Sequence, residues 1–216
     1  YAAMISHLDN QIGELIEKLK EIGQYENTII IFSSDNGPTY LGGVDFSFFN
    51  SSKPFSNGYG KTKGFLYEGG IRIPMIVSWP NKVIPGSTSN HISSFYDILP
   101  TLCDIAGTNI PNEIDGISFK NELLNSKQKT HDFLYWEFPS YNGQQAVRLS
   151  KWKGIRKNIF DGNMEIELYN LEDDILEEND LSKEYPDIIK RIEKIMLQEH
   201  ETSELDRFKF KELDDV

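Results

Sequence analysis

The sequence predicts an α/β fold in two parts, residues 1–125 and residues 126–216. The first part combines amphipathic helices with continuously apolar strands, which is typical of a layered sheet covered by helices. The second part has short strand-like runs separated by turn residues, followed by one amphipathic helix. We therefore expect a helix-covered sheet in the first part, and a small antiparallel sheet with a C-terminal helix in the second.

The first part opens with a predicted helix over residues 3–22. Apolar side chains recur there three and four positions apart, and Gly23 is a suitable stop. Residues 28–33 and 74–80 are apolar runs that we expect to form strands buried on both faces.

The remaining elements are a helix near the end of the first part and the whole of the second part. Because proline fits only the first turn or a kink of a helix, Pro100 indicates that the helix predicted over about 94–106 begins close to it. The second part is predicted to contain an antiparallel sheet of three or four strands and a helix over about residues 186–198. Its strand-like runs cover residues 132–138, 145–150, 152–158 and 165–171.

The composition excludes one broad class of partner. The chain has 34 acidic residues against 22 Lys and Arg, a net charge of −12. A nucleic-acid-binding protein normally shows a basic surface, and none is visible, so we expect no nucleic-acid partner.

No stretch is long and apolar enough to predict a membrane span. The sequence starts at Tyr1 and enters a helix almost at once, so we expect it to be the C-terminal part of a longer polypeptide.

Oxygen donors directly follow the first apolar strand. Asp35 and Asn36 lie in the segment SSDNGP, and ligands of open α/β sheets bind at the carboxyl ends of strands. Carboxylate and amide oxygens suit Ca²⁺ or Mg²⁺. The same residues also form turns and helix caps, so the dipeptide alone leaves both interpretations open.

A second candidate is the glycine-rich segment 58–74, which contains Lys61 and Lys63. A lysine on a loop whose backbone can approach a ligand can hold an oxyanion as a point charge. A solvated, flexible lysine loop is the alternative interpretation.

Together these segments resemble a known family. The order SSDNGP, KGFLYEGGIRIP, an apolar strand ending in WP, and DILPTLCDIAG is similar to the C-terminal half of the type I sulfatases, in the alkaline-phosphatase-like superfamily. QAVRLSKWKGIR and ELYNLEDDILEENDLS are similar to its small C-terminal sheet and the segment after it, so the resemblance covers residues 1 to about 198. The Asp-Asn dipeptide and YWEF…QAVR are most similar to the arylsulfatase and N-acetylgalactosamine-6-sulfatase-like branch.

The resemblance implies a sulfuric ester hydrolase acting on an aryl or sugar sulfate. Asp35 and Asn36 match the Ca²⁺ ligands of the family's second half. Lys63 matches the lysine that contacts the sulfate, which makes it both a substrate-binding and a catalytic candidate. Lys61 lies two residues too early for that role.

Four further residues are of interest. Glu68 and Arg72 match motif positions for which we expect a structural role, as a buried pair bracing the Gly-Gly turn. Trp136 and Glu137 are candidates for a sugar platform and a hydrogen-bond acceptor at the rim of the substrate pocket. Ordinary in-and-out alternation along a β-strand is the alternative for that pair.

The same resemblance implies parts of a site that this sequence lacks. Family members use a formylglycine made from Cys or Ser in a C/S-x-P/A-x-R signature, and no such signature occurs here. Ca²⁺ takes about 6–8 oxygen ligands, of which Asp35 and Asn36 supply at most about three. We therefore expect the formylglycine in a missing N-terminal part, an incomplete Ca²⁺ site, and no hydrolysis by this chain alone.

Two alternatives to the sulfatase hypothesis stay open. A phospho- or phosphonate-ester hydrolase of the same superfamily would share the metal geometry, and a non-catalytic fragment would serve as a binding or structural module. By resemblance, the partner would be a sulfated small molecule or glycan, and the parent protein would be periplasmic or secreted. The identity of the substrate is not readable from the residues.

Overall fold

The computed structural model describes residues 1–214, which fall into two compact units. Unit 1 comprises residues 1–33 and 74–131, and unit 2 comprises residues 34–73 and 132–216. The two units are thus interleaved along the chain, and the segment that follows the first strand belongs with the C-terminal sheet. The predicted division at residue 125 concerns the domains of the parent protein and stays a prediction.

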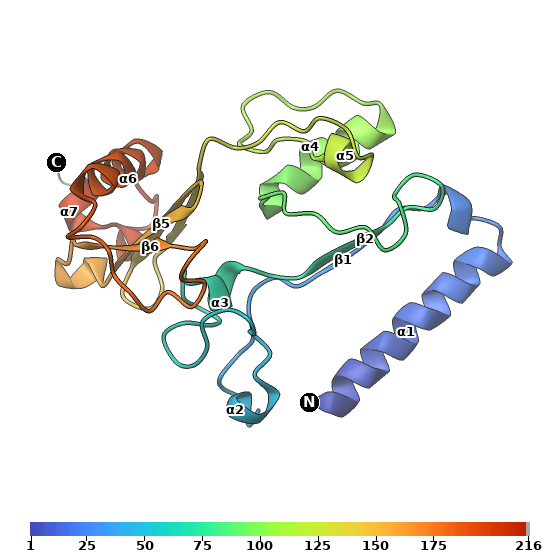
Figure 1. Cartoon of the computed structure of the whole chain (residues 1–216), viewed down its shortest axis with the longest axis horizontal. Helices are drawn as coiled ribbons and strands as arrows, with labels where there is room; N and C mark the ends of the chain where they lie inside the picture. The colour runs from blue at the N-terminus through green and yellow to red at the C-terminus, as the bar shows by residue number, and fades with distance from the viewer. Residues whose placement is uncertain (215–216) are drawn as a thin grey trace. The chain divides into compact units, whose positions relative to one another are not determined.

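Unit 1 contains one long helix, a two-stranded sheet and a helical region (Figure 1). The predicted first helix is confirmed, and it ends at Glu21, two residues before Gly23, whose φ of +69° is a left-handed conformation that glycine adopts without strain. The elements in chain order are α1 (Ala2–Glu21), a 3₁₀ turn (Tyr25–Asn27), β1 (Ile30–Ser33), β2 (Met75–Ser78), a second 3₁₀ turn (Phe95–Asp97), α4 (Ile98–Ala106) and α5 (Lys120–Leu123).

The strands β1 and β2 lie side by side and antiparallel, with Ile30 opposite Ser78. Both fall where the sequence predicts strands. Phe32 and Ile76 face each other in the register and are 40% and 62% exposed. Residues 1–214 therefore do not cover both faces of this pair, in contrast to the burial expected from its continuously apolar sequence.

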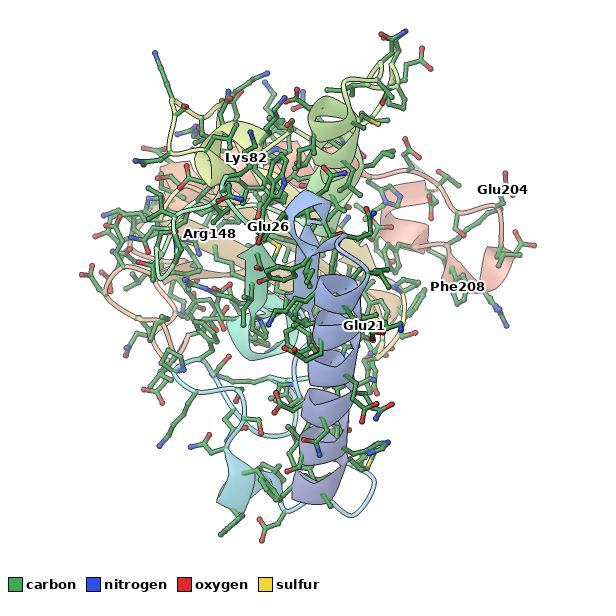
Figure 2. All side chains as sticks on the ribbon, turned by 90° about the vertical axis from the view of Figure 1, so that its right-hand side faces the viewer. Glu21, Glu26, Lys82, Arg148, Glu204 and Phe208 are labelled. Atoms are coloured by element: carbon green, nitrogen blue, oxygen red, sulfur yellow. The ribbon has the colours of Figure 1, made fainter. Side chains whose placement is uncertain are left out.

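Helix α1 is exposed along its length. Figure 2 shows its side chains, with Glu21 in the last turn. None of its residues is buried against the rest of the described chain. Surface ion pairs link Lys18 to Glu21 at 2.9 Å and Lys20 to Glu17 at 2.7 Å. Such pairs contribute only a few tenths of a kcal/mol each to a helix.

The start of α4 agrees with the proline argument. The helix begins at Ile98, so Pro100 lies in its first turn, where its missing N–H costs no hydrogen bond. The fully buried Asp97 fixes this end by accepting hydrogen bonds from the backbone N–H groups of Ser94 (2.8 Å) and Ile117 (2.7 Å).

Unit 2 is built on a four-stranded antiparallel sheet in the order β3-β4-β5-β6, which confirms the sheet predicted for the second part (Figure 1). Figure 1 also shows α6 lying along this sheet. The elements are α2 (Phe46–Phe49), α3 (Glu68–Ile71), β3 (Leu134–Phe138), β4 (Gln144–Leu149), β5 (Trp152–Lys157), a 3₁₀ turn (Ile159–Asp161), β6 (Ile166–Asn170), α6 (Pro186–Glu199), a 3₁₀ turn (Asp206–Phe208) and α7 (Lys211–Asp214).

Both faces of this sheet are covered. One face packs Ala146 and Ile155 against Leu66 and Tyr67 of the glycine-rich segment. The opposite face packs against α6; its core is formed by Val147, Leu149, Ile166, Leu168, Ile192 and Met196. The glycine-rich segment that carries the lysine candidate is therefore attached to the sheet by a hydrophobic core.

Candidate functional site

Backbone hydrogen bonds bring the two sequence candidates together within unit 2. The N–H of Gly37, next to Asn36, donates to the carbonyl of Gly70 at 2.8 Å. The N–H of Lys63 donates to the carbonyl of Pro38 at 3.2 Å. The Asp35–Asn36 turn and the lysine segment are therefore neighbours, although they are separated along the chain.

Glycines make this close approach possible. A Cβ atom on Gly37 would lie 1.8 Å from the carbonyl oxygen of Gly69, and one on Gly69 would lie 1.9 Å from that of Ser56. A Cβ atom on Gly70 would lie 2.0 Å from the carbonyl oxygen of Phe65. Backbone atoms cannot move aside as a flexible side chain can, so the packing requires glycine at all three positions.

The charged groups of the two candidates are free to bind a ligand. Asp35 and Lys63 are exposed, and neither side chain has a hydrogen-bond or ion-pair partner among residues 1–214. Asn36 uses its Nδ2 to donate to the carbonyl of Gly37 at 2.9 Å, which leaves its Oδ1 as a further acceptor. A carboxylate and an amide oxygen on one turn are of the kind that Ca²⁺ binds.

The donor set suits the metal that the family implies, but it is partial. Within the described chain, no three Asp, Glu, His or Cys side chains form a group able to hold a metal ion. Two neighbouring residues supply fewer than the about 6–8 oxygens that Ca²⁺ takes. Asp35 and Asn36 therefore fit as part of a Ca²⁺ site that needs further ligands.

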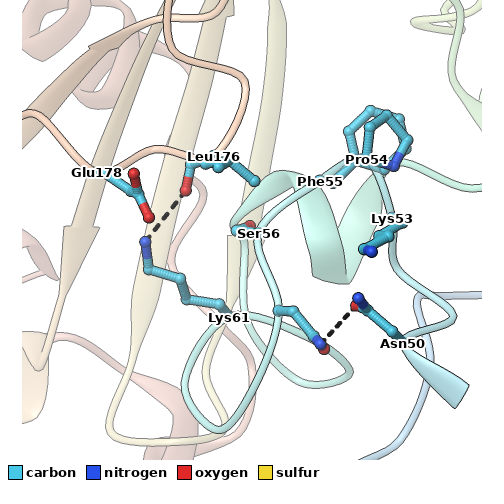
Figure 3. A pocket seen from close by; sticks show the side chains of 9 residues that line it. Asn50, Lys53, Pro54, Phe55, Ser56, Lys61, Leu176 and Glu178 are labelled. Carbon is cyan, nitrogen blue, oxygen red and sulfur yellow. Dashed lines mark hydrogen bonds between the residues drawn. The ribbon is translucent and has the colours of Figure 1, made fainter. Parts of the chain in front are cut away.

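Lys61 has a different environment from Lys63. Its Nζ donates to the carbonyl oxygens of Glu177 at 2.7 Å and Leu176 at 3.2 Å, and it lies 5.3 Å from the centre of the Tyr67 ring. Figure 3 shows this lysine reaching the loop around Leu176. Lys61 thus ties two loops of unit 2 together, while Lys63 is left with its charge exposed.

A cavity of about 650 Å³ lies beside Lys61. Its walls include Asn50, Phe55 and Glu178 (Figure 3). None of the three sequence-predicted residues Asp35, Asn36 and Lys63 lines it. The hollow and the candidate metal and sulfate residues are therefore separate features of unit 2.

Glu68 is buried, as expected, but its main partner is not the expected one. Its Oε2 lies 3.2 Å from Nη1 of Arg72, whose side chain is 48% exposed. The buried cation is Lys153 of β5, whose Nζ lies 2.8 Å from Oε1 of Glu68 and 2.9 Å from Oε1 of Glu177. Sequence analysis missed Lys153 and Glu177, because a lysine in a strand and a glutamate in an acidic run carry no signal of burial.

Burial and the charge of Lys153 act against each other on the pKa values of both acids. Burial alone would raise the pKa of Glu68, but the charge and hydrogen bond of Lys153 outweigh it and lower that pKa. Burial dominates for Glu177 and raises its pKa, although Lys153 opposes the shift. One lysine therefore serves two buried carboxylates, and it stabilises the charged form of Glu68 more effectively.

Trp136 and Glu137 lie on opposite faces of β3. Trp136 packs against the core beside Tyr67 and Ile155. Glu137 points to the other face, where its Oε2 accepts hydrogen bonds from the Tyr135 hydroxyl, from Gln145 Nε2 at 3.0 Å and from His200 Nδ1 at 2.8 Å. The structure does not bring the two side chains together, and their roles toward a substrate stay predictions.

Two histidines without a sequence signal take part in buried networks. His200 bridges Glu137 and Asp214, with its Nε2 2.9 Å from Oδ1 of Asp214. In unit 1, His131 Nε2 lies 2.8 Å from Oδ1 of the buried Asp97. His200 is 63 positions from Glu137 along the chain, and His131 is 34 positions from Asp97. Only the fold brings these partners together.

Two family models match this chain. A family model described as Sulfatase matches residues 1–108. A second, described as N-sulphoglucosamine sulphohydrolase, C-terminal, matches residues 59–202. The two models together span the lysine segment and the four-stranded sheet.

Individual relatives are similar over most of the chain. A sulfatase of Schizosaccharomyces pombe is 31% identical over 94% of this chain and 43% of its own length. The N-acetylglucosamine-6-O-sulfatase of Bacteroides thetaiotaomicron is 32% identical over 84% of this chain and 31% of its own length. A protein solved with its substrate D-glucosamine-2-N,6-O-disulfate is 28% identical, with a TM-score of 0.74 over 92% of this chain and 39% of that one.

The chain spans less than half the length of each of these relatives. A phosphonate monoester hydrolase from Silicibacter pomeroyi, at 18% identity and a TM-score of 0.63, shares the fold alone. The architecture is therefore the C-terminal part of the alkaline-phosphatase-like α/β fold with its small antiparallel sheet. With family models matching from the first helix to the segment after α6, the chain belongs to the sulfatase family.

Proposed function

We propose that the protein containing this chain hydrolyses sulfate esters, and that residues 35–63 supply one side of its active site. The observation that carries this proposal is the exposed Lys63, whose backbone N–H is bonded to Pro38, three residues after the exposed Asp35. A carboxylate and an ammonium on two hydrogen-bonded segments, neither with a partner among residues 1–214, would suit a bound cation and a bound anion. Because the chain belongs to the sulfatase family, the substrate that we propose is a sulfate ester.

Each residue has a distinct role in this proposal. The Asp35 carboxylate and the Asn36 Oδ1 would hold Ca²⁺, which when bound would offset charge on the sulfuryl oxygens. The Lys63 ammonium would contact the sulfate, and its attraction would strengthen as those oxygens gain negative charge. The nucleophile would come from a formylglycine outside residues 1–216, since the sequence contains no C/S-x-P/A-x-R signature.

The substrate class that we propose is a sulfated aryl compound or sugar. Two relatives support the sugar: the N-acetylglucosamine-6-O-sulfatase, and the protein solved with D-glucosamine-2-N,6-O-disulfate. Trp136 and Glu137 would act on substrate preference. The family resemblance also suggests a periplasmic or secreted protein; none of the described helices is long and apolar enough to cross a membrane.

The test compares lysine and aspartate variants of the full-length protein on an aryl sulfate. We expect Lys63→Ala to lower turnover by about 10²–10³, the value of one charged donor to a transition state. Asp35→Ala should be at least as damaging, because it also loosens the metal. Lys82→Ala, at an exposed lysine after β2, is the matched control and should leave turnover unchanged.

Two outcomes would contradict the proposal. One is a Lys63→Ala variant with the turnover of Lys82→Ala. The other is a wild-type protein that hydrolyses an aryl phosphate or phosphonate ester faster than the sulfate, which would favour the alternative hydrolase of the same fold.

A further inference from the structure

Three ionisable side chains meet between the sheet and the glycine-rich segment of unit 2. Lys153 projects from β5 and is fully buried; Glu68 begins α3, and Glu177 lies in the loop after β6. The exposed fractions of the two glutamates are 5% and 1%. The Lys153 Nζ lies within 2.9 Å of an oxygen from each. A buried cation between two carboxylates from remote segments joins all three segments.

The second oxygen of Glu177 holds the backbone at the start of α3. Its Oε2 accepts from the N–H of Glu68 at 2.7 Å and from the hydroxyl of Ser56 at 3.0 Å. The same hydroxyl oxygen accepts from the N–H of Gly69 at 3.1 Å. Glu177 therefore fixes two consecutive N–H groups, one directly and one through Ser56.

These contacts lead directly to the candidate site. Gly70, next in the chain, accepts the hydrogen bond from Gly37, which follows the proposed metal ligand Asn36. On the other side, the main-chain oxygen of Glu177 accepts from Lys61, two residues before Lys63. A continuous set of hydrogen bonds thus runs from β5 to both halves of the site.

Glu177 itself is held in an unusual backbone conformation. Its φ is +54°, in the left-handed region that costs a non-glycine residue free energy. Its side chain and its main chain are both engaged by the contacts above. The conformation aims the carboxylate inward and the carbonyl at Lys61 at the same time.

We propose that Lys153 and Glu177 are positioning residues, which fix the segment carrying Lys63 against the Asp35–Asn36 turn. This inference rests on the proposed sulfatase function for its kinetic readout. Neither residue would touch the substrate. Their effect would be on the geometry of the reacting groups, where a displacement of about 1 Å can cost about 10²-fold in rate.

The chain offers a matched control on the same strand. Arg156, three residues after Lys153 on β5, is also a fully buried cation, but it faces the opposite side of the sheet. Its Nη1 donates to Oε1 of Gln145 at 2.9 Å, and its other polar partners, the Met164 carbonyl and Glu193, also lie outside the glycine-rich segment. Arg156→Met therefore removes a buried cation without touching the proposed positioning contacts.

The experiment measures kcat, KM and Tm of the full-length protein as wild type, Lys153→Met, Glu177→Gln and Arg156→Met. We expect the first two variants to lose about 10- to 100-fold in kcat, with a smaller change in KM, at a temperature where all are folded. Arg156→Met should lower Tm but keep the wild-type kcat. If Lys153→Met does not fold, the nearly isosteric Glu177→Gln decides. Equal kcat in all four proteins would overturn the inference.

Amide hydrogen exchange separates this inference from the proposed function. The N–H groups of Lys63, Glu68 and Gly69 should exchange faster in Lys153→Met and in Glu177→Gln, and at the wild-type rate in Arg156→Met. If the wild type shows no sulfatase activity, the proposed function fails while the exchange result still tests the positioning contacts. Unchanged exchange in both variants would overturn the inference without any assay of hydrolysis.

Discussion

At the scale of single residues, backbone geometry decides what the site can tolerate. Lys61 and Lys63 look alike in the sequence, yet Lys61 is bonded to two carbonyls and Lys63 is exposed. The family motif predicted a difference between them, because the spacing from Glu68 matches Lys63 to the lysine that contacts sulfate; that contact stays a prediction. Composition alone could not have done so, because the carbonyls that capture Lys61 come from a loop 115 and 116 positions away.

Two glycine substitutions test this geometry, because we expect them to change the free energy of unfolding in opposite directions. Gly69→Ala would place a Cβ atom 1.9 Å from the Ser56 carbonyl oxygen, and we expect overpacking to reduce the free energy of unfolding by about 1–3 kcal/mol or more. Gly13→Ala, in the exposed α1 with open space around it, should instead raise that free energy by about 0.5–1 kcal/mol. Denaturant unfolding of both variants measures the difference. A neutral Gly69→Ala would show that the segments are less closely packed than described.

At the scale of elements, the sequence predicted where along the chain the strands and helices lie, but it did not predict which segments contact them. Turn residues bound the short apolar runs of the second part, so the strands and α6 were predicted within a few residues of their observed limits. The faces were harder to assign, because a sheet covered on both sides lacks a clean alternation of polar and apolar residues. Lys153 is the clearest case: its partner Glu68 is 85 positions away, and no local pattern indicates their meeting.

The segment after α6 provides a pH-dependent prediction. Burial would lower the pKa of His200, but its hydrogen bonds to Glu137 and Asp214 outweigh this and raise it above the ordinary 6.5. A raised pKa means that the folded state favours the charged imidazolium. That contribution is fully present below pH 6.5, and it is lost as pH rises through the higher folded value. The Tyr135 hydroxyl and Gln145 Nε2 also donate to Glu137, so His200 shares this carboxylate with two other donors.

We therefore expect wild type to exceed His200→Gln in Tm by a few degrees near pH 6, and by less as the pH rises further. Burial alone would raise the pKa of Asp214, but hydrogen bonds from Thr202 and His200 outweigh it and lower that pKa below 3.8. Asp214 therefore stays ionised in mildly acidic solution. The Tm advantage of the wild type should extend down toward that pH. Thermal denaturation from pH 5 to 9 measures it. His7→Gln, at an exposed position of α1 and outside this hydrogen-bond network, is the control variant. A constant wild-type advantage from pH 5 to 9 would contradict the assignment.

At the scale of the whole molecule, the net charge of the chain opposes the binding of the proposed substrate. The chain's charge of −12 repels an anion at long range, so the proposed sulfate ester would have to be captured by local cations. Lys63 and a bound Ca²⁺ would provide that capture. The chain itself carries one side of this arrangement, since Asp35 and Asn36 are too few ligands to hold Ca²⁺ tightly.

The last prediction concerns the 216-residue chain on its own. We expect it to hydrolyse an aryl sulfate no faster than buffer, with or without added Ca²⁺, because a positioned lysine and a partial metal site cannot replace a nucleophile. The measurement compares the chain, its Lys63→Ala variant and the full-length protein under identical conditions. The first two should be indistinguishable, and only the third should turn over substrate. If the chain were active and Lys63→Ala abolished that activity, the nucleophile would have to lie within the 216 residues, and the formylglycine would not be required.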